Sequence, residues 1–534
     1  MTPEAIWVQY SKIQEYCREK NLFEIVKTNE NFYDGRQWEG VKADNLPKPV
    51  INILQRVVKY MIATLSSNDV AVSITPLSDV EDDANKLKII SNEIEKVIEQ
   101  ARIKEASKLM IRNGAVDGSA FMLQTFDPDF ETGQAMKGAI ENLLIDNTQV
   151  YFGNPYSNNV QKQPYIIIAL RQYVDQVKLE AKECGLSDEV IDSIMPDNDT
   201  EQANDDSTKL VTVLLRFEKK THVIKETVIQ NIGGQPVPIE VSKKVKTVFF
   251  TKSTHHVMLK EETDLGYQRY PIVCFGWDGM KNSYLYNSPL TYVIPNQIFI
   301  NKCYAIAQMY GLQSAFPKII YDRNKADIAD LMDNTSPSAM ANIDMLGKVL
   351  DFIKVPDFSN NILNLLQDII AQTKECMGVN DASLGNVKPD NTSAIVALQE
   401  ASNVPLEIQR QAFFHMWEDT VRNILDIMVT DYGIRKCLTE DGEIAEVDYS
   451  LLRNINYELN VDIGTGAQFS EIAQIQTLDK LFQSQIIDAR TYIDAIPSKY
   501  VPIKNKILSQ MDEQEQEAQQ MMNPQAMEVA NQIQ

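Results

Sequence analysis

Four histidines are the only imidazole groups in the chain of 534 residues, and their positions do not favour catalysis or metal binding. His255 and His256 are adjacent, so on a strand they would point to opposite faces and could not both bind one metal ion. His222 lies in a strand-like run and His415 in a helical one, and we expect structural roles for all four. The acidic run 197–199 lacks the glycine and the terminal glutamate of a calcium loop, and it is typical of a solvated turn.

Sequence motifs of several enzyme classes are absent from the whole chain. It contains no Gly-x-x-x-x-Gly-Lys-Ser/Thr phosphate loop, no Gly-x-Gly-x-x-Gly and no His-Glu-x-x-His, which are signatures of nucleotide and zinc sites. A metal-dependent hydrolase built from scattered carboxylates is the enzymatic alternative, because such sites assemble from distant residues. We expect no enzymatic activity, no cofactor and no bound metal.

The net charge of the chain limits how it can bind DNA. There are 51 Lys and Arg residues against 74 Asp and Glu residues, a formal net charge of −23. A protein that grips nucleic acid needs an excess of basic residues to neutralise phosphates. A conventional DNA-binding protein is therefore excluded, whereas a protein past which DNA slides is not.

The cysteines and the hydropathy indicate a protein of a reducing compartment that does not enter a membrane. The six cysteines lie far apart without a Cys-x-x-Cys pair, which favours free thiols. The N-terminus has neither the basic leader nor the apolar core of a signal peptide. No stretch approaches the roughly 18 uncharged apolar residues that span a bilayer, so we expect a cytosolic setting.

Helical patterns dominate the first part of the chain. A Thr-Pro pair at the start predicts a helix over residues 2–27. Apolar residues at helical spacing predict an amphipathic helix over 50–65, and alternation then predicts a strand over 70–76. A long charged helix over 81–112 is expected to end at Gly114, a typical C-cap residue.

Strand patterns follow, at 119–170 and most strongly at 209–260. The second region contains three strand-like segments (VTVLLRF, HVIKETVI and KVKTVFF) and a turn at 233–236. It also carries ten Lys or Arg residues against three acidic ones. Two interpretations stay open: the solvated outer face of a hairpin, or a docking surface for an acidic partner or a phosphate backbone. The candidate docking residues are Lys243, Lys244 and Lys246.

The second half of the chain is expected to be mainly helical. In order, its patterns predict a helix over 288–312, a strand–helix–strand insert over 313–358, a helix over 360–377, a Gly-, Asn-, Asp- and Pro-rich stretch, a helix over 393–431 kinked at Pro405, a strand pair at 443–463, and helices from Ser470. Apolar stripes run along the two helices that flank the insert. The expected fold class is α+β and mainly helical.

Four segments carry a family resemblance through their order and spacing. They are NFYDGRQW at 31–38, VYFGNPYS at 150–157, NSPLTYVIPNQIFINK at 287–302 and GVNDASLGNVKPDNTSAIVALQEAS at 378–402. With these segments the chain resembles the portal proteins of tailed bacteriophages, most closely the short-tailed phage group, over roughly residues 5–510. Asn154 departs from the pattern, since the family commonly has an acidic residue there.

The resemblance implies a portal fold with named parts. These are an N-terminal wing at 1–285, with helices and a β-rich part at 119–276; a first stem helix at 286–312; a small α/β clip at 313–358; a second stem helix at 359–377; a tunnel loop at 378–392; a kinked wing helix and strand pair at 393–465; and a helical crown with the C-terminal tail at 466–534.

The resemblance also implies a function. Portal subunits form a ring, usually of twelve copies, at one capsid vertex, through which DNA is packaged by the terminase motor and later ejected. The implied partners are further copies of the chain, the terminase large subunit, tail or adaptor proteins at the clip, major capsid and scaffolding proteins, and double-stranded DNA that passes without sequence specificity. The implied location is the virion, after assembly in the cytoplasm of the host bacterium. Another oligomeric virion component, an adaptor or a vertex protein, is the alternative.

Two sets of channel residues follow from the resemblance. The tunnel-loop residues that could touch the DNA backbone without reading bases are Asp381, Ser383, Asn386, Lys388, Asp390 and Asn391. The charged residues of the stem are few, and they are Lys302, Asp368, Lys374 and Glu375. A near-neutral stem suits a channel wall past which DNA slides, and it suits an ordinary helix bundle as well.

Overall fold

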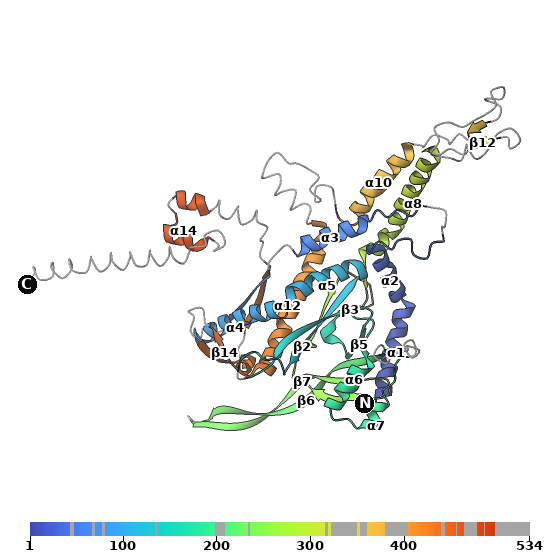
Figure 1. Ribbon diagram of the computed structural model, residues 1–534. Coiled ribbons are helices and arrows are strands. Elements are labelled where there is room, and N and C mark those ends of the chain that lie inside the picture. The colour runs from blue at the N-terminus through green and yellow to red at the C-terminus, as the bar shows by residue number, and fades with distance from the viewer. Residues whose placement is uncertain are drawn as a thin grey trace, which may run out of the picture. The chain divides into compact units, whose positions relative to one another are not determined.

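A computed structural model describes most of the N-terminal three quarters of the chain and short parts of the remainder. The described residues are 1–42, 47–66, 70–76, 81–134, 136–197, 209–232, 235–315, 319–321, 350–352, 360–379, 404–438, 444–454, 457–463, 478–484 and 486–496. The chain divides into two compact units, one of residues 1–66 and 72–461 and the other of residues 67–71 and 462–534. Both helices and strands are present (Figure 1), so the α+β class is confirmed.

The first helix is shorter than expected. α1 (Pro3–Glu19) begins at the Thr2 cap, but a second helix, α2 (Leu22–Tyr33), follows after a break. The expectation of one helix over 2–27 is therefore wrong. The break lies at Asn21, whose φ of 55° is left-handed, a conformation that asparagine tolerates better than most residues.

The long charged helix is also two helices. α4 (Glu81–Gln100) and α5 (Ile103–Asp117) are separated at Arg102, whose φ is 50°. Gly114 is not the C-cap, because α5 continues to Asp117 and Gly118 follows with a φ of 93°. A Cβ atom at Gly114 would lie 2.5 Å from the ring of Phe275, so this glycine allows the helix to approach the neighbouring strand closely.

Two antiparallel sheets form the β-rich part. The three-stranded sheet has the order β3-β2-β9 and consists of β2 (Ser119–Asp127), β3 (Ala139–Asp146) and β9 (Ile272–Gly276). The five-stranded sheet has the order β4-β5-β6-β7-β8 and consists of β4 (Val150–Phe152), β5 (Tyr165–Tyr173), β6 (Leu210–Ile232), β7 (Gln235–Ser253) and β8 (Met258–Asp264). The segments VTVLLRF and HVIKETVI are thus one strand, β6, because pairing with β7 continues through both.

Short elements connect these sheets. They are η1 (Val160–Lys162), α6 (Val174–Glu183), α7 (Asp188–Asp192), β10 (Asp278–Gly279) and β11 (Tyr286–Asn287).

The expected helix over 50–65 is α3 (Ile53–Leu65), capped by the Asn52 side chain, and the expected strand is β1 (Val70–Pro76).

The second half contains the expected helical pair and insert strands. α8 (Pro289–Ala315) and α10 (Asn360–Cys376) confirm the predicted helices, and β12 (Ile319–Tyr321) pairs with β13 (Leu350–Phe352). Pro405 lies in η4 (Val404–Leu406), a single turn of 3-10 helix, and α12 (Glu407–Ile427) begins after it. A proline at a helix start is favourable, since it has no N–H group to donate.

The strand pair expected at 443–463 is wrong. β15 (Ile444–Asp448) pairs with the preceding β14 (Ile434–Leu438), and β16 (Tyr457–Ile463) pairs with β1. The remaining described elements are η5 (Met428–Tyr432), which has π-helical geometry, η6 (Tyr449–Asn454) and α14 (Ala489–Ala495) in the second unit. No described helix is long and apolar enough to cross a membrane.

The core of the first unit gathers around the three-stranded sheet. α5 and α12 both contact it. The ring of Phe275 on β9 meets that of Phe413 edge-on, with centroids 6.4 Å apart, and Phe413 meets the fully buried Trp417 in the same way. Aromatic pairs of this geometry stabilise a core beyond their buried area. The core therefore joins the N-terminal sheet to α12 from the far end of the sequence.

Candidate functional site

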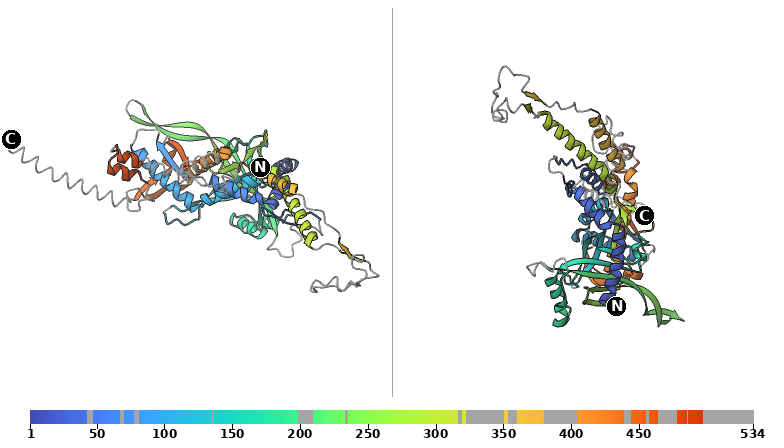
Figure 2. Two further views of the ribbon diagram at one scale, coloured as in Figure 1. Left: turned by 90° about the horizontal axis from the view of Figure 1, so that it is seen from above. Right: turned by 90° about the vertical axis from the view of Figure 1, so that its right-hand side faces the viewer.

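α8 and α10 form a long helical pair with few charges. The two helices lie side by side (Figures 1 and 2), and Asn296 on α8 donates a hydrogen bond to Thr373 on α10 at 3.2 Å. The four predicted stem residues lie on this pair. Lys302, Asp368 and Glu375 are exposed, and Lys374 is half-buried.

The outside of this pair carries large apolar side chains. On α8, Tyr292, Phe299 and Ile306 are spaced by seven residues and are 63%, 38% and 53% exposed. Seven residues are nearly two helical turns, so these three lie along one face. On α10, Leu363 and Leu365 are 43% and 47% exposed. An apolar stripe of this length on a single chain indicates a surface that another molecule covers.

Buried side-chain amides bond the N-terminal half of α8 to the rest of the chain. The Gln297 side chain accepts a hydrogen bond from the Ile53 N–H at 3.3 Å and donates one to the Ile51 carbonyl at 2.7 Å. Asn301 donates to Gln37 at 2.6 Å. Asn301 belongs to the segment 287–302 and Gln37 to the segment NFYDGRQW, so two segments far apart in sequence meet here. Sequence reasoning noted both segments but not this contact, for which the sequence carries no local signal.

Asn154 has a local structural role. Its side-chain oxygen accepts a hydrogen bond from the Tyr156 N–H at 3.1 Å, and its own N–H donates to Gln163 at 2.9 Å. An aspartate could accept the same bond, because the acceptor is an oxygen two residues before the donor. The departure from the family pattern therefore leaves the turn intact.

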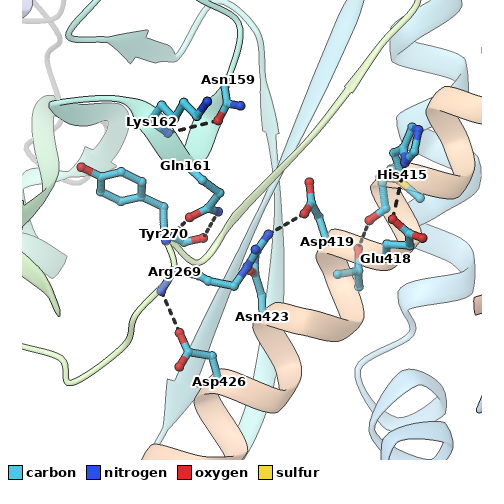
Figure 3. A network of polar contacts seen from close by, with 12 residues as sticks. Asn159, Gln161, Lys162, Arg269, Tyr270, His415, Glu418, Asp419, Asn423 and Asp426 are labelled. Carbon is cyan, nitrogen blue, oxygen red and sulfur yellow. Dashed lines mark hydrogen bonds and ion pairs between the residues drawn. The ribbon is translucent and has the colours of Figure 1, made fainter. Parts of the chain in front are cut away.

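A polar network ties the segment between β8 and β9 to α12 (Figure 3). Asp426 accepts hydrogen bonds from the backbone N–H groups of Gln268 and Arg269, both at 2.8 Å. The Arg269 guanidinium donates to Asn423 at 3.1 Å and pairs with Asp419. Burial raises the pKa of Asp426 above its usual range. No motif predicted this network, since its members lie as far as 158 positions apart in the sequence.

We expect the network to stabilise the fold measurably. Asp426→Ala would leave the part-buried Arg269 N–H without its acceptor, at a cost of about 1–3 kcal/mol, whereas water can replace the acceptor at the exposed Gln268 N–H. Asp426→Asn retains one oxygen and should cost less. Urea denaturation measures both variants. Equal stability of Asp426→Ala and the parent chain would contradict this account.

The predicted docking lysines lie on the β6–β7 ladder. Lys244 pairs with Val223 and Lys246 with Thr221, so these two lysines share a face and both are exposed. Lys243 pairs with Ile224 in the register, and its side chain lies outside the described ones.

The two adjacent histidines come together instead of pointing apart. Thr254 donates its N–H to the Val257 carbonyl at 2.8 Å, which makes a turn there. The rings of His255 and His256 have centroids 4.0 Å apart, and Trp7 packs on His255 at 4.4 Å. Burial, followed by the charge of His256, lowers the pKa of His255. In the described part of the chain no group of three His, Cys, Asp or Glu side chains could hold a metal ion.

Gly378, the first residue of the predicted tunnel loop, lies close to Pro405. Gly378, with a φ of 71°, follows α10, and a Cβ atom there would lie 2.9 Å from the Cβ of Pro405. The chain that leaves α10 thus returns to the same place at η4. The six predicted loop residues (Asp381, Ser383, Asn386, Lys388, Asp390 and Asn391) lie outside the described residues, as does most of 313–358.

Asp117 is a buried carboxyl at the C-terminal end of α5. It is 8% exposed and lies 3.9 Å from the Arg112 guanidinium, which also pairs with Glu30. Burial, followed by the charge of Glu30, raises the pKa of Asp117 to about 9. The folded chain therefore holds a proton that the unfolded chain loses above about pH 4.

This raised pKa predicts a pH-dependent stability. The protonated Asp117 carboxyl contributes to the free energy of unfolding. This contribution is fully present below about pH 4 and is lost as the pH rises toward 9. Asp117→Asn cannot ionise, so its melting temperature should fall less between pH 5 and pH 9 than that of the parent. Asp129→Asn removes an exposed carboxylate and should follow the parent curve. An equal fall of the melting temperature between pH 5 and pH 9 in all three chains would contradict the raised pKa of Asp117.

Comparison with known families gives a match over nearly the whole chain. The family model described as "Phage P22-like portal protein" matches residues 13–534. No curated protein matches the chain.

Proposed function

Because this chain belongs to the P22-like phage portal protein family, we propose that copies of it form a ring of twelve at one vertex of the capsid and that double-stranded DNA passes through the ring. The family is structural, and it places the chain in the virion and in DNA packaging. The terminase motor would drive DNA inward through this channel, and ejection would use the same path.

The apolar stripe on α8 carries the ring proposal. Tyr292, Phe299 and Ile306 are exposed in the single chain, and burial of their remaining exposed apolar surface favours association. In a closed ring each copy presents the stripe to a neighbour, so every stripe is covered.

The sparse charges of α8 and α10 support a channel role. Lys302 is the sole charged residue among the 27 residues of α8. Each Lys or Arg that contacts a phosphate adds affinity for DNA, so a wall with few cations lets DNA move. We propose that 286–312 and 359–377 are the stem helices around the channel.

The remaining parts follow the family arrangement. We propose that 1–285 is the wing, 313–358 the clip at which tail or adaptor proteins dock, 378–392 the tunnel loop, 393–465 the wing helix with its strands, and 466–534 the crown. Assembly would take place in the host cytoplasm, with capsid and scaffolding proteins around the wing and the terminase large subunit at the channel.

Negative-stain electron microscopy of the purified chain tests the proposal. We expect funnel-shaped rings with a central hole. Compact oligomers without a hole would favour an adaptor or vertex protein. Stoichiometric divalent metal in the purified chain would instead favour the hydrolase alternative.

Lys244 and Lys246 give a prediction about capsid docking. They are exposed on one face of the ladder, and we propose that this face meets an acidic surface of a scaffolding or capsid protein. Lys244→Glu/Lys246→Glu should form normal rings but enter fewer particles, as counted by quantitative immunoblotting of purified heads. Normal incorporation would favour a solvated face.

A further inference from the structure

A cavity of about 310 Å³ lies beside the polar network that ties α12 to the segment between β8 and β9. Arg269 and Asp426 belong both to this network and to the wall of the cavity (Figure 3). The other described parts of the wall come from η5, η6 and β16, all within the first compact unit. The volume lies near the lower end of the range for binding pockets in proteins.

One face of α12 forms the first wall of the cavity. Arg422, Leu425 and Asp426 all line it, and positions three and four residues apart share a face of a helix. Val429, in η5 directly after α12, lines it as well. Leu425 is 3% exposed and Val429 is half-buried, whereas Arg422 is exposed. This wall therefore combines a buried apolar part with an exposed guanidinium group.

η6 and β16 supply a second wall of the same character. Leu452 on η6 is 3% exposed and Leu459 on β16 is half-buried, and both line the cavity. Arg453, next to Leu452 in the chain, is exposed and lines the cavity too. Aliphatic side chains and guanidinium groups thus lie together on both walls.

The charges of the wall are mostly positive. Three arginines line the cavity against one described carboxylate, that of Asp426, which accepts its hydrogen bonds from backbone N–H groups. Arg269 pairs with Asp419. Arg453 donates two hydrogen bonds to uncharged oxygens, at 3.0 and 3.5 Å. Among the described residues, Arg422 and Arg453 have no acidic partner within ion-pair distance, although the chain as a whole has a net charge of −23.

The positive charge extends from the cavity to the base of the β6–β7 ladder. Burial, followed by the charges of Arg269 and then of Lys246, lowers the pKa of Lys219 to about 8. Lys246 is exposed. A surface of one sign of charge attracts partners of the opposite sign and orients them as they approach. Acidic molecules are therefore favoured near the cavity.

We propose that this cavity binds an acidic peptide segment of a partner protein, in which a carboxylate meets Arg422 and Arg453 and a neighbouring aliphatic side chain packs on Leu452 and Leu459. The planar guanidinium group matches a carboxylate with two parallel hydrogen bonds. The aliphatic part of the wall distinguishes a peptide from a nucleic-acid backbone, which has phosphates but no aliphatic side chain to bury there. The site lies within a single chain, so this inference does not rest on the proposed ring.

Fluorescence anisotropy with the purified full chain and a labelled peptide Gly-Glu-Leu-Glu-Leu-Gly tests the site. Arg422→Glu should raise the Kd at least about tenfold, because it replaces an attractive charge with a repulsive one. Arg422 is exposed, so the fold should be retained, which circular dichroism checks. Arg18→Glu makes the same change at an exposed position outside the cavity and should change the Kd less than about twofold. Equal affinities of the parent and Arg422→Glu would overturn the proposal.

Two altered peptides separate the carboxylate from the apolar contact without changing the protein. Replacing both Glu residues of the peptide with Gln should raise the Kd at least about tenfold, and replacing both Leu residues with Ser at least about threefold. Undiminished binding of the Ser peptide would show attraction by charge alone and overturn the proposal. So would no binding to the parent at about 1 mM peptide, or a DNA duplex that displaces the peptide and loses affinity in Arg422→Glu.

Discussion

Ile306→Glu should abolish ring assembly and leave monomers or small oligomers. Ile306 is the last of the three residues of the α8 stripe and is 53% exposed in the single chain, so the fold of the chain does not depend on this side chain being apolar. In a ring the carboxylate would be buried against a neighbour at every interface. An unpaired buried charge costs at least about 3 kcal/mol, roughly a hundredfold in each association constant.

Gln308→Glu is the matched control for this variant. It adds the same charge two residues farther along α8, at an exposed polar position on a different face of the helix. We expect this control to form rings of normal mass by size-exclusion chromatography with light scattering, and both variants to keep the secondary structure of the parent by circular dichroism. Rings of normal mass from Ile306→Glu would rule out the apolar face of α8 as the contact between copies.

Replacing residues 382–388 with a Gly-Ser linker of equal length should abolish DNA packaging without affecting the ring. The segment lies in the middle of the loop 378–392, where most residues are glycine, proline or polar, a composition typical of a segment that can move at low cost. Gly378 lies beside Pro405, so the start of the loop is held by residues that the replacement leaves unchanged. We propose that Lys388 and its polar neighbours touch the DNA backbone as it passes.

An in vitro packaging assay measures the effect of this replacement as nuclease-resistant DNA. Rings of the variant must first show normal mass, which separates a defect in DNA handling from one in assembly. Lys388→Ala alone should give a smaller loss, since it removes one charge-assisted contact. Wild-type packaging by rings with the replaced loop would show that the segment is a passive connector.

Local patterns predicted the helices α3, α8 and α10 because the information lies within each segment. Apolar residues at helical spacing specify a buried face wherever the segment packs. The breaks at Asn21 and Arg102 were not predicted, because the information that sets them does not lie within the local pattern. The apolar pattern runs on through both positions, and the left-handed backbone conformation there depends on how the two flanking helices pack.

Strand pairing depended on distant parts of the chain. β15 was expected to pair with the strand after it, but it pairs with β14 before it, and β16 pairs with β1, nearly 400 positions away. Alternation shows that a segment is a strand without showing its partner. The length of β6, by contrast, became clear only from its continuous register with β7.

The sequence alone determined the family and the class of function, because four segments in a fixed order and spacing are a property of the chain that needs no folding. It also determined the near-neutral character of α8, which is a matter of composition. Only the tertiary structure decided that Asn301 meets Gln37, that Arg269 is held by Asp426 on α12, and that one face of α8 stays uncovered. These features join residues hundreds of positions apart through hydrogen bonds and packing, and such contacts leave no periodic pattern in the sequence.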